Sequence, residues 1–340
     1  MSYQSVFAPN LFNGHTVVIT GAGSGMGRCI AHELASLGAN VALVGRTLEK
    51  LQKVEQEIEE ILRQVGQNTS KTACFSCDIR DEAVVAATVA QIAERFGRID
   101  ALVNNAGGQF PAPLHRINAK GFDAVVRNNL TGGFLFAREV YTQCMRRQAG
   151  EKLPDGSKPH AGTIVNIIMD MWGSTPGMGH SGAARAGMLN LTETMALEWA
   201  PVRVNAVAPG FIATSGMDKY PPIMTPLIRN IHKDVPLQRM GTESEVSAGV
   251  VFLLSPAAAF ISGSCLRIDG AAPQARRHWP YVGDMDDLHG SAPGAGTTQA
   301  FNGFHLSETP KVLQGGSWIS NNAVTRRFVK WAHKNWIRKS

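Results

Sequence analysis

A glycine-rich turn near the N-terminus limits the possible folds of this chain more than any other feature of its sequence. The β-branched run Thr16–Thr20 (TVVIT) leads directly into the turn, and a helix-like segment follows from about Gly25 to Leu37. The N-terminus of a helix offers unpaired N–H groups and partial positive charge, and glycine lets a phosphate approach the backbone. This arrangement predicts a dinucleotide site, with an ordinary strand–helix turn as the alternative. The cofactor-binding residues expected in the turn are Thr20, Gly21, Gly23, Ser24, Gly25, Met26 and Gly27.

Short apolar runs alternate with helical segments along most of the chain. Such runs are typical of strands buried on both faces, which occur in parallel sheets covered by helices. Right-handed crossovers then give a doubly wound α/β fold with three layers, α/β/α. Helical stretches are expected near 25–37, 48–65, 81–96, 119–148, 178–199 and 243–254. The expected strands are Thr16–Thr20, Asn40–Gly45, Cys74–Asp78, Ala101–Asn105, Thr163–Ile168, Val202–Ala208 and Cys265–Ile268.

The alternation ends after Gly270, which divides the 340-residue chain into two parts. We expect one domain with both the dinucleotide and the substrate site over residues 1–272, followed by an irregular extension over 273–340. The extension includes a stretch rich in Gly, Asp and Ser, Gly283–Ala300, and it ends in a basic tail. Residues 328–336 have amphipathic spacing, which favours weak contact with an anionic membrane surface. Packing of the tail on the oligomer and disorder are the alternatives.

The net charge of +6 belongs to that basic tail. Residues 326–340 carry six basic side chains and no acidic one, so the charges of residues 1–325 sum to zero. The globular part therefore gives no electrostatic indication of nucleic-acid binding. The sequence has no run of about 18 apolar residues and no recognisable secretory signal, and its five cysteines lack the spacing of a metal site. We expect buried free thiols, no bound metal and a cytoplasmic protein.

The end of the second expected strand bears on the choice of cofactor. Enzymes that use NAD place an acidic residue about 20 residues beyond the glycines, where it binds the ribose 2′-hydroxyl. This chain has Gly45 and Arg46 there, and no acid before Glu49. A guanidinium can bind a 2′-phosphate through paired, charge-assisted hydrogen bonds. Arg46 therefore predicts NADP(H), unless its side chain is merely solvated.

Five motifs that follow one another along the chain resemble those of the short-chain dehydrogenase/reductase family. They are Thr20-Gly21-x-x-x-Gly25-x-Gly27, Cys77-Asp78-Ile79, Asn104-Asn105-Ala106-Gly107, Asn129-Leu130-Thr131-Gly132 and Pro209-Gly210. The resemblance covers roughly residues 10–272 and implies a Rossmann fold. It also implies a homodimer or homotetramer built on the helices near 119–148 and 178–199, and a substrate-covering segment over 220–239. The further cofactor-binding residues that it implies are Asp78, Ile79, Asn105, Ala106, Gly107, Pro209, Gly210 and Thr214.

The proton-handling residues depart from the usual pattern of that family. Most members use a serine, a tyrosine and a lysine, and the lysine lowers the pKa of the tyrosine for proton transfer. Here Ser181 and Arg185 stand at the tyrosine and lysine positions, and Ile168 stands where the serine is expected. The asparagine of the family's site is kept as Asn129. A serine hydroxyl is shorter and much less acidic than a phenol, so ketone–alcohol interconversion by the usual route is not expected.

These departures resemble one branch of the family, the peroxisomal trans-2-enoyl-CoA reductases and the related 2,4-dienoyl-CoA reductases. The similar segments include Ser181–Gly187 (SGAARAG), Gly107–Phe110 (GGQF) and Val165–Ile168 (VNII). The resemblance implies an NADPH-dependent reductase that acts on an enoyl thioester in fatty-acid metabolism. Leu189 stands where the peroxisomal enoyl reductases carry a tyrosine proton acceptor. The alternatives are a homologue without turnover that serves as a scaffold or regulatory subunit, and a carbonyl reductase or alcohol dehydrogenase with an unusual acid.

Reduction of an unsaturated thioester needs a hydride at the β-carbon, donors for the developing enolate oxygen, and a proton at the α-carbon. We expect Arg185, Asn129 and Ser181 to form or orient the polar end of the site, and Arg185 also to contact the cofactor. A guanidinium stays charged, so Arg185 suits electrostatic stabilisation better than proton transfer. The acid is open between water, Ser181, His180 and Asp170. Asp170 follows the fifth expected strand at its C-terminal end, where ligands bind in such sheets.

Overall fold

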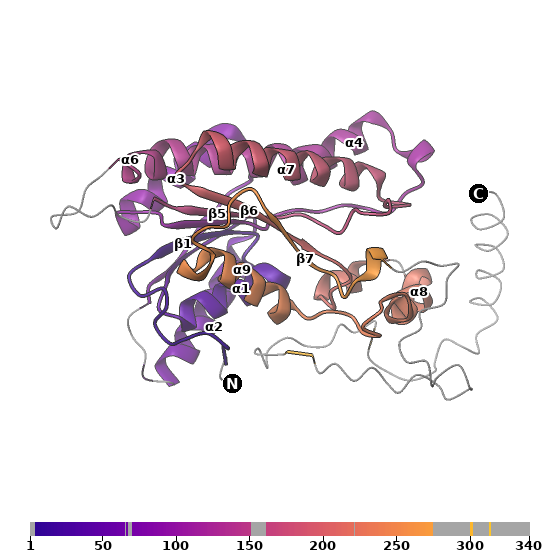
Figure 1. Ribbon diagram of the computed structural model, residues 1–340, viewed down its shortest axis with the longest axis horizontal. Coiled ribbons are helices and arrows are strands. Elements are labelled where there is room, and N and C mark those ends of the chain that lie inside the picture. The colour runs from indigo at the N-terminus through magenta and orange to yellow at the C-terminus, as the bar shows by residue number, and fades with distance from the viewer. Residues whose placement is uncertain are drawn as a thin grey trace.

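The computed structural model describes residues 4–64, 66, 70–150, 161–220, 222–274, 300–301 and 313. Its centre is one sheet of seven parallel strands in the order β3-β2-β1-β4-β5-β6-β7 (Figure 1). The direction of winding reverses between β1 and β4, so the sheet is doubly wound, as the alternation of apolar runs predicts. The strands are β1 Thr16–Thr20, β2 Asn40–Gly45, β3 Thr72–Ser76, β4 Ala101–Asn104, β5 Thr163–Ile167, β6 Arg203–Pro209 and β7 Cys265–Ile268.

Helices cover both faces of the sheet and form the two outer layers. One layer contains α1, α2 and α9, and the opposite layer contains α3, α4 to α6 and α7 (Figure 1). This arrangement confirms the three-layer Rossmann fold. The helices are α1 Gly25–Ser36, α2 Leu48–Gln64, α3 Glu82–Phe96, α4 Ala119–Val126, α5 Gly132–Val140, α6 Arg146–Gln148, α7 Gly179–Glu198, α8 Thr225–Asn230 and α9 Glu243–Leu254.

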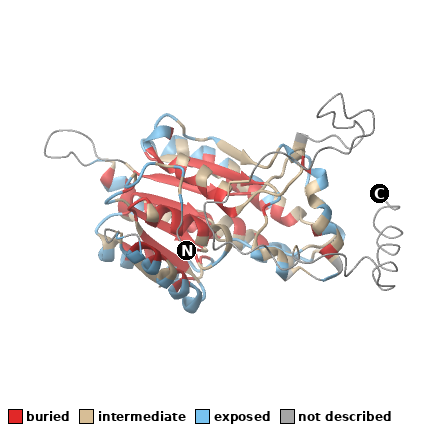
Figure 2. Cartoon of the chain, turned by 90° about the horizontal axis from the view of Figure 1, so that it is seen from below, coloured by how far each residue is buried: buried red, intermediate tan, exposed pale blue. Residues whose placement is uncertain are grey.

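Successive residues of the central strand β1 pack against the two layers in turn. Val17 and Ile19 belong to the core under α1, α2 and α9, whereas Val18 belongs to the core under α3, α5 and α7. All three are fully buried, and burying one such side chain stabilises a fold by about 1.5–3 kcal/mol. Figure 2 shows buried residues in the sheet and on the inward helix faces, with exposed residues outside. The sheet therefore forms a rigid support for the loops that follow the C-terminal ends of its strands.

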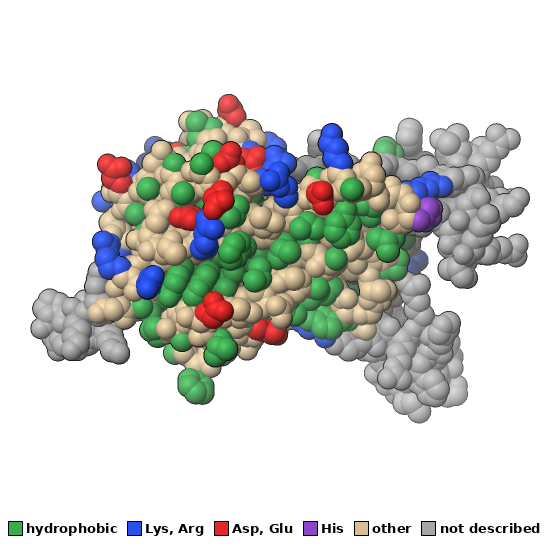
Figure 3. Space-filling model, turned by 90° about the horizontal axis from the view of Figure 1, so that it is seen from above, with side chains coloured by type: hydrophobic (Ala, Val, Ile, Leu, Met, Phe, Trp, Pro, Cys, Tyr) green, Lys and Arg blue, Asp and Glu red, His purple; other side chains and the backbone are tan. Residues whose placement is uncertain are grey.

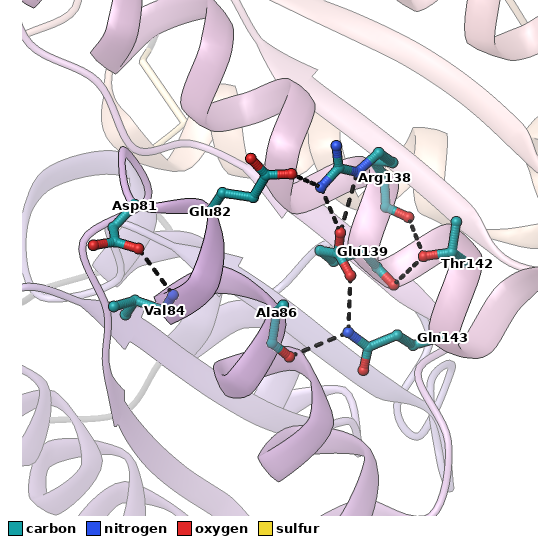
Figure 4. Close-up of polar contacts among 8 residues, drawn as sticks. All are labelled: Asp81, Glu82, Val84, Ala86, Arg138, Glu139, Thr142 and Gln143. Carbon is teal, nitrogen blue, oxygen red and sulfur yellow. Dashed lines mark hydrogen bonds and ion pairs between the residues drawn. The ribbon is translucent and has the colours of Figure 1, made fainter.

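Polar contacts join α3 to α5 and the turn that follows it (Figure 4). Arg138 of α5 pairs with Glu82 at the start of α3 and with the adjacent Glu139, each at 2.7 Å. Gln143 donates hydrogen bonds to the Ala86 carbonyl oxygen at 3.1 Å and to the Glu139 carboxylate at 2.9 Å. These contacts hold the long helical segment over 119–148 in place against α3.

That helical segment contains two π-helical turns, which the sequence did not predict. Arg127–Thr131 (η2) separates α4 from α5, and Tyr141–Met145 (η3) separates α5 from α6. Such turns are frequent at functional sites. The first carries Asn129, whose Nδ2 donates to the Val125 carbonyl oxygen at 3.0 Å. One extra residue per turn hardly changes an apolar pattern, so the sequence alone indicates a single helix.

The boundaries of β3 and the burial of two thiols differ from the predictions. Strand β3 pairs with β2 from Thr72 to Ser76, so the predicted range of 74–78 is shifted by two residues and Asp78 lies beyond the strand. The prediction followed the apolar side chains, whereas pairing with β2 sets the limits. All five cysteines are free, as predicted, but Cys74 and Cys265 are half-buried instead of buried.

Of the extension over 273–340, the structure describes residues 273, 274, 300, 301 and 313. Thr242, at the N-terminus of α9, donates a hydrogen bond to the Phe301 carbonyl oxygen at 2.6 Å. The tail over 326–340, with its expected membrane contact, lies outside the described residues, as does most of the glycine-rich stretch before it. Among the described residues, no helix combines the length and the apolar character needed to cross a membrane.

Candidate active site

A cleft of about 370 Å³ lies where the sheet reverses its winding, beyond the C-terminal ends of β1, β2 and β4. Ligands bind at this point in open α/β sheets. Most of the residues predicted to bind the cofactor line it, namely Gly21, Gly23, Ser24, Gly25, Met26, Arg46, Asp78, Ile79, Asn105, Ala106, Gly107 and Thr214. Lining residues that the sequence did not identify are Gly45, Thr47, Lys50, Leu51, Cys77, Asn128, Ser215 and Gly216.

Two glycines let the turn after β1 pack tightly against the loop after β4. Gly21 has a φ of +69°, in the left-handed region that favours glycine. A side chain at Gly27 would collide with Asn105 Nδ2 and with the Gly21 carbonyl oxygen. Asn105 Nδ2 in turn donates to the carbonyl oxygens of Thr20 (3.0 Å) and Gly21 (3.3 Å). The turn is therefore fixed to β4, with the start of α1 at the cleft.

The N-terminus of α1 is open to an anion. Ser24 occupies the N-cap position, yet its side chain makes no capping hydrogen bond, and the first turn holds no acidic residue. The first N–H groups of a helix have no partner within the helix and carry partial positive charge. Because Ser24, Gly25 and Met26 line the cleft, a pyrophosphate fits these donors. The residues present therefore fit a bound dinucleotide.

Some predicted cofactor residues lie behind the wall of the cleft and shape it from there. Thr20 Oγ1 accepts hydrogen bonds from the N–H groups of Asn105 and Ala106, both at 3.0 Å, so it positions the loop after β4. Gly210 packs against Asp269, whose Cα would lie 2.7 Å from a Cβ at that position. The predicted cofactor residues that do not line the cleft are Thr20, Gly27, Arg185, Pro209 and Gly210.

Basic side chains gather at the end of the cleft next to β2. Arg46 and Lys50 both line it and are exposed. Asp78 lies nearby, and a hydrogen bond from Arg80 (Nε to Oδ1, 2.8 Å) is the main cause that lowers the pKa of Asp78 to about 2. The charge of Arg46 adds to that lowering. Asp78 is thus ionised at neutral pH and can accept a hydrogen bond from an amino group.

Arg185 and Asn129 lie together beneath Gly107. A side chain at Gly107 would collide with the Arg185 guanidinium and would lie 2.7 Å from Asn129 Oδ1. Arg185 Nη1 donates to the Ile167 carbonyl oxygen at 2.7 Å, and burial lowers its pKa to about 10, so it stays charged at neutral pH. Asn129 Nδ2 donates to the Gly108 carbonyl oxygen at 2.7 Å. A buried positive charge therefore lies directly under the strip 107–108.

Ser181 is fully buried, and its hydroxyl is engaged by Gln109. The hydroxyl donates to Gln109 Oε1 at 2.9 Å and lies 3.6 Å from the Met169 sulfur. Gln109 itself is exposed. Because its oxygen accepts from Ser181, the group that Gln109 offers to a ligand is its amide N–H. In this geometry the serine orients an amide donor, and the sequence did not identify Gln109 as its partner.

His180 has no polar contact that would suit it for proton transfer. It is fully buried, and neither ring nitrogen has a hydrogen-bond partner among the described residues. Its ring packs edge-on against Phe110, with 4.6 Å between the ring centroids. In this arrangement His180 serves as an apolar support for the strand-end loop that carries Gln109.

Asp170 lies just beyond β5, where its N–H donates to the Pro209 carbonyl oxygen at 2.9 Å. Its Oδ1 is buried and has no hydrogen-bond partner among the described residues. Burial and the nearby Asp269 carboxylate raise the pKa of Asp170, while Arg267 acts in the opposite direction. The preceding residue, Met169, contacts Ser181 through its sulfur at 3.6 Å. A carboxyl with a raised pKa is suited to proton donation.

Four side chains near this site were not predicted from the sequence: Gln109, Trp172, Arg267 and Asp269. A polar residue at the C-terminal end of a parallel strand is a signal that could have found Asp269, just as it found Asp170. Arg267 and Trp172 give no such signal, because their contact joins β7 to the loop after β5. A contact between residues from two different strand ends, such as that of Arg267 with Trp172, can be recognised only from the three-dimensional structure.

A doubly wound sheet with a phosphate-binding turn at its reversal point is the architecture of the dinucleotide-dependent oxidoreductases. Residues 21–271 match a protein-family model described as enoyl-(acyl carrier protein) reductase. The chain belongs to the short-chain dehydrogenase/reductase family, and its relatives include dienoyl-CoA reductases, which confirms the resemblance found in the sequence.

Two named relatives and one solved structure illustrate this membership. The probable 2,4-dienoyl-CoA reductase of Bacillus subtilis (strain 168) is 36% identical over 259 residues, which cover 75% of this chain and 94% of that protein. The peroxisomal 2,4-dienoyl-CoA reductase of Rattus norvegicus is 32% identical over 276 residues, covering 79% and 87%. A structure described as citronellol catabolism dehydrogenase (AtuB) from Pseudomonas aeruginosa PAO1 is 52% identical, with a TM-score of 0.67, and covers 80% of this chain and 100% of that one.

Proposed function

We propose that this chain is an NADPH-dependent reductase that adds a hydride and a proton to the conjugated double-bond system of an enoyl or dienoyl thioester. One observation carries the proposal: Ser181, which stands at the family's tyrosine position, donates to the Oε1 of the exposed Gln109 at 2.9 Å, two residues beyond Gly107 of the dinucleotide cleft. The dienoyl-CoA reductases among the relatives support the substrate class.

The cleft fits the cofactor along its length. A bound nicotinamide dinucleotide would supply the hydride. The open N–H groups at Gly25 and Met26 suit its pyrophosphate, and Arg46 with Lys50 suits a 2′-phosphate. Arg185, beneath Gly107, places a positive charge under the far end of the cleft.

We assign the two remaining requirements of the reaction to Gln109 and Asp170. Hydride addition to a conjugated thioester leaves negative charge on the thioester oxygen, which needs hydrogen-bond donors. The Gln109 amide is such a donor, and the buried charge of Arg185 favours the same negative charge. The raised pKa of Asp170 favours its protonated form, and such a carboxyl can give a proton to carbon, after which solvent restores it. No tyrosine is needed for either step.

An activity assay tests the proposal. Purified protein is mixed with NADPH and a panel of 2-enoyl-CoA esters, 2,4-dienoyl-CoA esters and ketones, and the loss of NADPH absorbance is followed. We expect oxidation with the thioesters, and we expect Asp170→Asn to lower kcat/KM by about 10²- to 10⁴-fold with an unchanged Kd for NADPH. Turnover of ketones alone would favour a carbonyl reductase, and tight NADPH binding without turnover would favour a non-catalytic homologue.

Cofactor choice is tested separately at Arg46. We expect Arg46→Ala to weaken NADPH binding by about 10- to 100-fold, since a charge-assisted hydrogen bond contributes about 1.5–3 kcal/mol. The Kd for NADH, measured by fluorescence titration, should not change. Lys50→Ala is a matched control with a smaller loss, because a lysine binds phosphate as a point charge. Equal Kd values for NADPH and NADH in the unaltered protein would contradict the assignment.

A second substrate class is favoured by the solved structure that is 52% identical to the chain, because that protein is described as a dehydrogenase of citronellol catabolism. Citronellol has a methyl-branched apolar chain, so an unsaturated thioester derived from it would be a branched form of the same substrate. Comparison of kcat/KM for straight and methyl-branched enoyl thioesters decides between them. A preference of about tenfold or more for the branched series would assign this class.

We further propose that the protein is a homodimer or homotetramer that associates through the layer of α4, α5 and α7. Figure 3 looks onto this layer and shows apolar side chains gathered in a band across it. Leu197 of α7 is 82% exposed and Phe122 of α4 is 36% exposed. A contiguous apolar surface on a chain of this size favours a protein partner, and a second copy of the chain is the partner that we propose.

A further inference from the structure

The loop after β4 runs along the N-terminal part of α7, and its contacts follow a regular order. It begins near Gly107, which lines the dinucleotide cleft and lies over Arg185. Gln109 comes next, and its side-chain oxygen accepts a hydrogen bond from Ser181 at 2.9 Å. Because Ser181 precedes Arg185 in α7, the loop over 107–114 leads from the cleft toward the start of that helix.

Two large apolar side chains, Phe110 and Leu114, follow Gln109 on this loop. The Phe110 ring packs edge-on against His180, with 4.6 Å between the ring centroids. Leu114 packs against the preceding residue of α7, since a Cβ at Gly179 would lie 2.9 Å from the Leu114 Cδ1. Both side chains remain open to solvent nevertheless, Phe110 at 41% and Leu114 at 65% exposed. They therefore form one apolar surface at the start of α7, next to the exposed Gln109.

Helix α4 holds the Phe110 ring from another side. A Cβ at Gly121, in the first turn of α4, would lie 3.1 Å from the Phe110 Cζ, so the glycine leaves room for the ring. The loop is fixed farther along as well, where the Ala112 N–H donates to the Gly177 carbonyl oxygen at 2.8 Å. A surface that is held in this way needs little ordering when a ligand binds, which favours affinity.

The support behind the ring offers no polar group, although it is a histidine. His180 is fully buried, and neither of its ring nitrogens has a hydrogen-bond partner among the residues that the structure describes. The exposed side of this pair therefore offers apolar contact alone, whereas the neighbouring Gln109 offers a hydrogen-bond donor. A ligand that matches this order has a polar group near the cofactor cleft and an apolar chain beyond it.

We propose that Phe110 and Leu114 bind the acyl chain of the thioester substrate and that Phe110 determines which chain lengths bind tightly. This inference rests on the proposed reductase function, in which the thioester oxygen lies at the Gln109 amide and fixes where the chain begins. The chain then passes over Phe110 first and Leu114 second. Each methylene group that it buries strengthens binding by about fourfold, so affinity rises with chain length until the apolar surface ends.

Saturated acyl-CoA esters test this surface without turnover, because they have no double bond to reduce. Butyryl-, hexanoyl-, octanoyl- and decanoyl-CoA are titrated into the protein with NADPH present, and calorimetry gives each Kd. In the unaltered protein we expect Kd to fall by about fourfold for each added methylene group. In Phe110→Ala the Kd for decanoyl-CoA should rise by about tenfold or more, with little change for butyryl-CoA. Equal Kd values along the series in the unaltered protein would overturn the proposal, as would an unaltered series in Phe110→Ala.

Leu114→Ala tests the direction of the chain. Because Leu114 comes after Phe110 on the loop, we expect weaker binding of decanoyl-CoA and little change for hexanoyl-CoA, whereas Phe110→Ala affects both. Leu114 is mostly exposed, so its replacement leaves the fold intact and provides the test even where Phe110→Ala does not fold. Phe260→Ala is the matched control, since Phe260 is fully exposed in the turn that follows α9, and it should keep the series of the unaltered protein. Equal losses for hexanoyl- and decanoyl-CoA in Leu114→Ala would contradict the proposed direction.

A second copy of the chain is the other partner that could cover this apolar surface. Light scattering coupled to size-exclusion chromatography distinguishes the two, and we expect Phe110→Ala to keep the mass of the unaltered protein. A lower mass together with an unaltered chain-length series would assign the ring to a contact between copies and overturn the proposal.

Failure of the acyl-chain surface and failure of the reductase function give different results. If no thioester is reduced, the Kd series of the saturated esters still shows whether Phe110 binds the chain. If enoyl-CoA esters are reduced with the same kcat/KM at every chain length and the Kd series is flat, the reductase assignment stands and the acyl-chain surface is wrong.

Discussion

Glu243 is an acidic residue in an unfavourable place. It lies in the first turn of α9, is 6% exposed, and packs next to Gly25 of the glycine-rich turn after β1. Burial raises the pKa of Glu243 to about 7, although the charge of Arg28 acts against the rise. The folded state therefore binds this proton more tightly than the unfolded state does. The contribution of Glu243 to the free energy of unfolding is greatest at low pH and falls as the pH rises toward about 7.

Replacement of Glu243 should remove the cost in stability of ionising this buried carboxyl. We expect Glu243→Gln to raise the free energy of unfolding by up to about 3 kcal/mol near pH 8 and by much less near pH 5, because each pKa unit corresponds to about 1.4 kcal/mol. Urea unfolding at the two pH values measures the difference. A gain that is equal at both would show that charge is not its cause.

Glu245, on the same turn of α9, is a control of opposite sign. Hydrogen bonds from Arg239 and from the Thr242 N–H lower its pKa despite partial burial. Its contribution to stability is present above the unfolded-state pKa and is lost as the pH falls through the lower folded-state value. Glu245→Gln should therefore destabilise the protein near pH 8, in contrast to Glu243→Gln.

Gln109 and Ser181 show why part of the site could not be predicted. The sequence places a serine at the tyrosine position and indicates that it cannot inherit the role of a phenol. Which partner it meets depends on a contact between residues 72 positions apart, and no local pattern records that. The glycine-rich turn, in contrast, was predictable because strand, glycines and helix are adjacent in the chain.

The contact between the two residues makes a graded prediction. We expect Gln109→Leu to lower kcat/KM for thioester reduction by about 10²- to 10³-fold, as loss of an oxyanion donor does. Ser181→Ala should cost about tenfold, because it frees the amide without removing it. The Kd for NADPH should stay the same in both. A larger loss of kcat/KM from Ser181→Ala than from Gln109→Leu would indicate that the serine hydroxyl itself takes part in the reaction.

At the scale of elements, the apolar pattern predicted the seven strands and their helices because the five inner strands are buried on both faces and the two edge strands, β3 and β7, are half-buried. It missed features that do not change the pattern. The π-helical turn over 127–131, which carries Asn129, adds one residue to a turn within an otherwise regular helix. The end of β3 depends on its register with β2, which places Asp78 in the cleft instead of in the strand.

The junction of β1 and α1 gives a test at this scale. Gly27 is helical, but a Cβ there would collide with Asn105 and with the Gly21 backbone. Gly27→Ala must therefore push α1 away from the loop after β4, and we expect a loss of about 2 kcal/mol or more in unfolding free energy, as overpacking produces. NADPH binding, measured by calorimetry, should also weaken.

Gly25→Ala is the comparison. Its Cβ would approach no closer than 3.6 Å to another residue, and its cost comes from a φ of +59°, which we expect to be about 1–2 kcal/mol. If Gly25→Ala destabilises the protein more than Gly27→Ala does, backbone conformation and not the close approach of β4 determines the structure of the turn.

At the scale of the whole molecule, the layer of α4, α5 and α7 leaves apolar side chains exposed, among them Leu197 and Phe122. The buried face of α7 includes Ala184, Met188 and Met195, and Leu197 lies off that face. We expect Leu197→Asp and Phe122→Asp each to weaken self-association, because a charge placed in an apolar interface must be desolvated. Light scattering coupled to size-exclusion chromatography, at several protein concentrations, gives the mass of the assembly.

Val6→Asp, at a 68% exposed apolar position outside this layer, is the control and should keep the mass of the unaltered protein. If only Val6→Asp caused dissociation, the interface would not be formed by α4, α5 and α7.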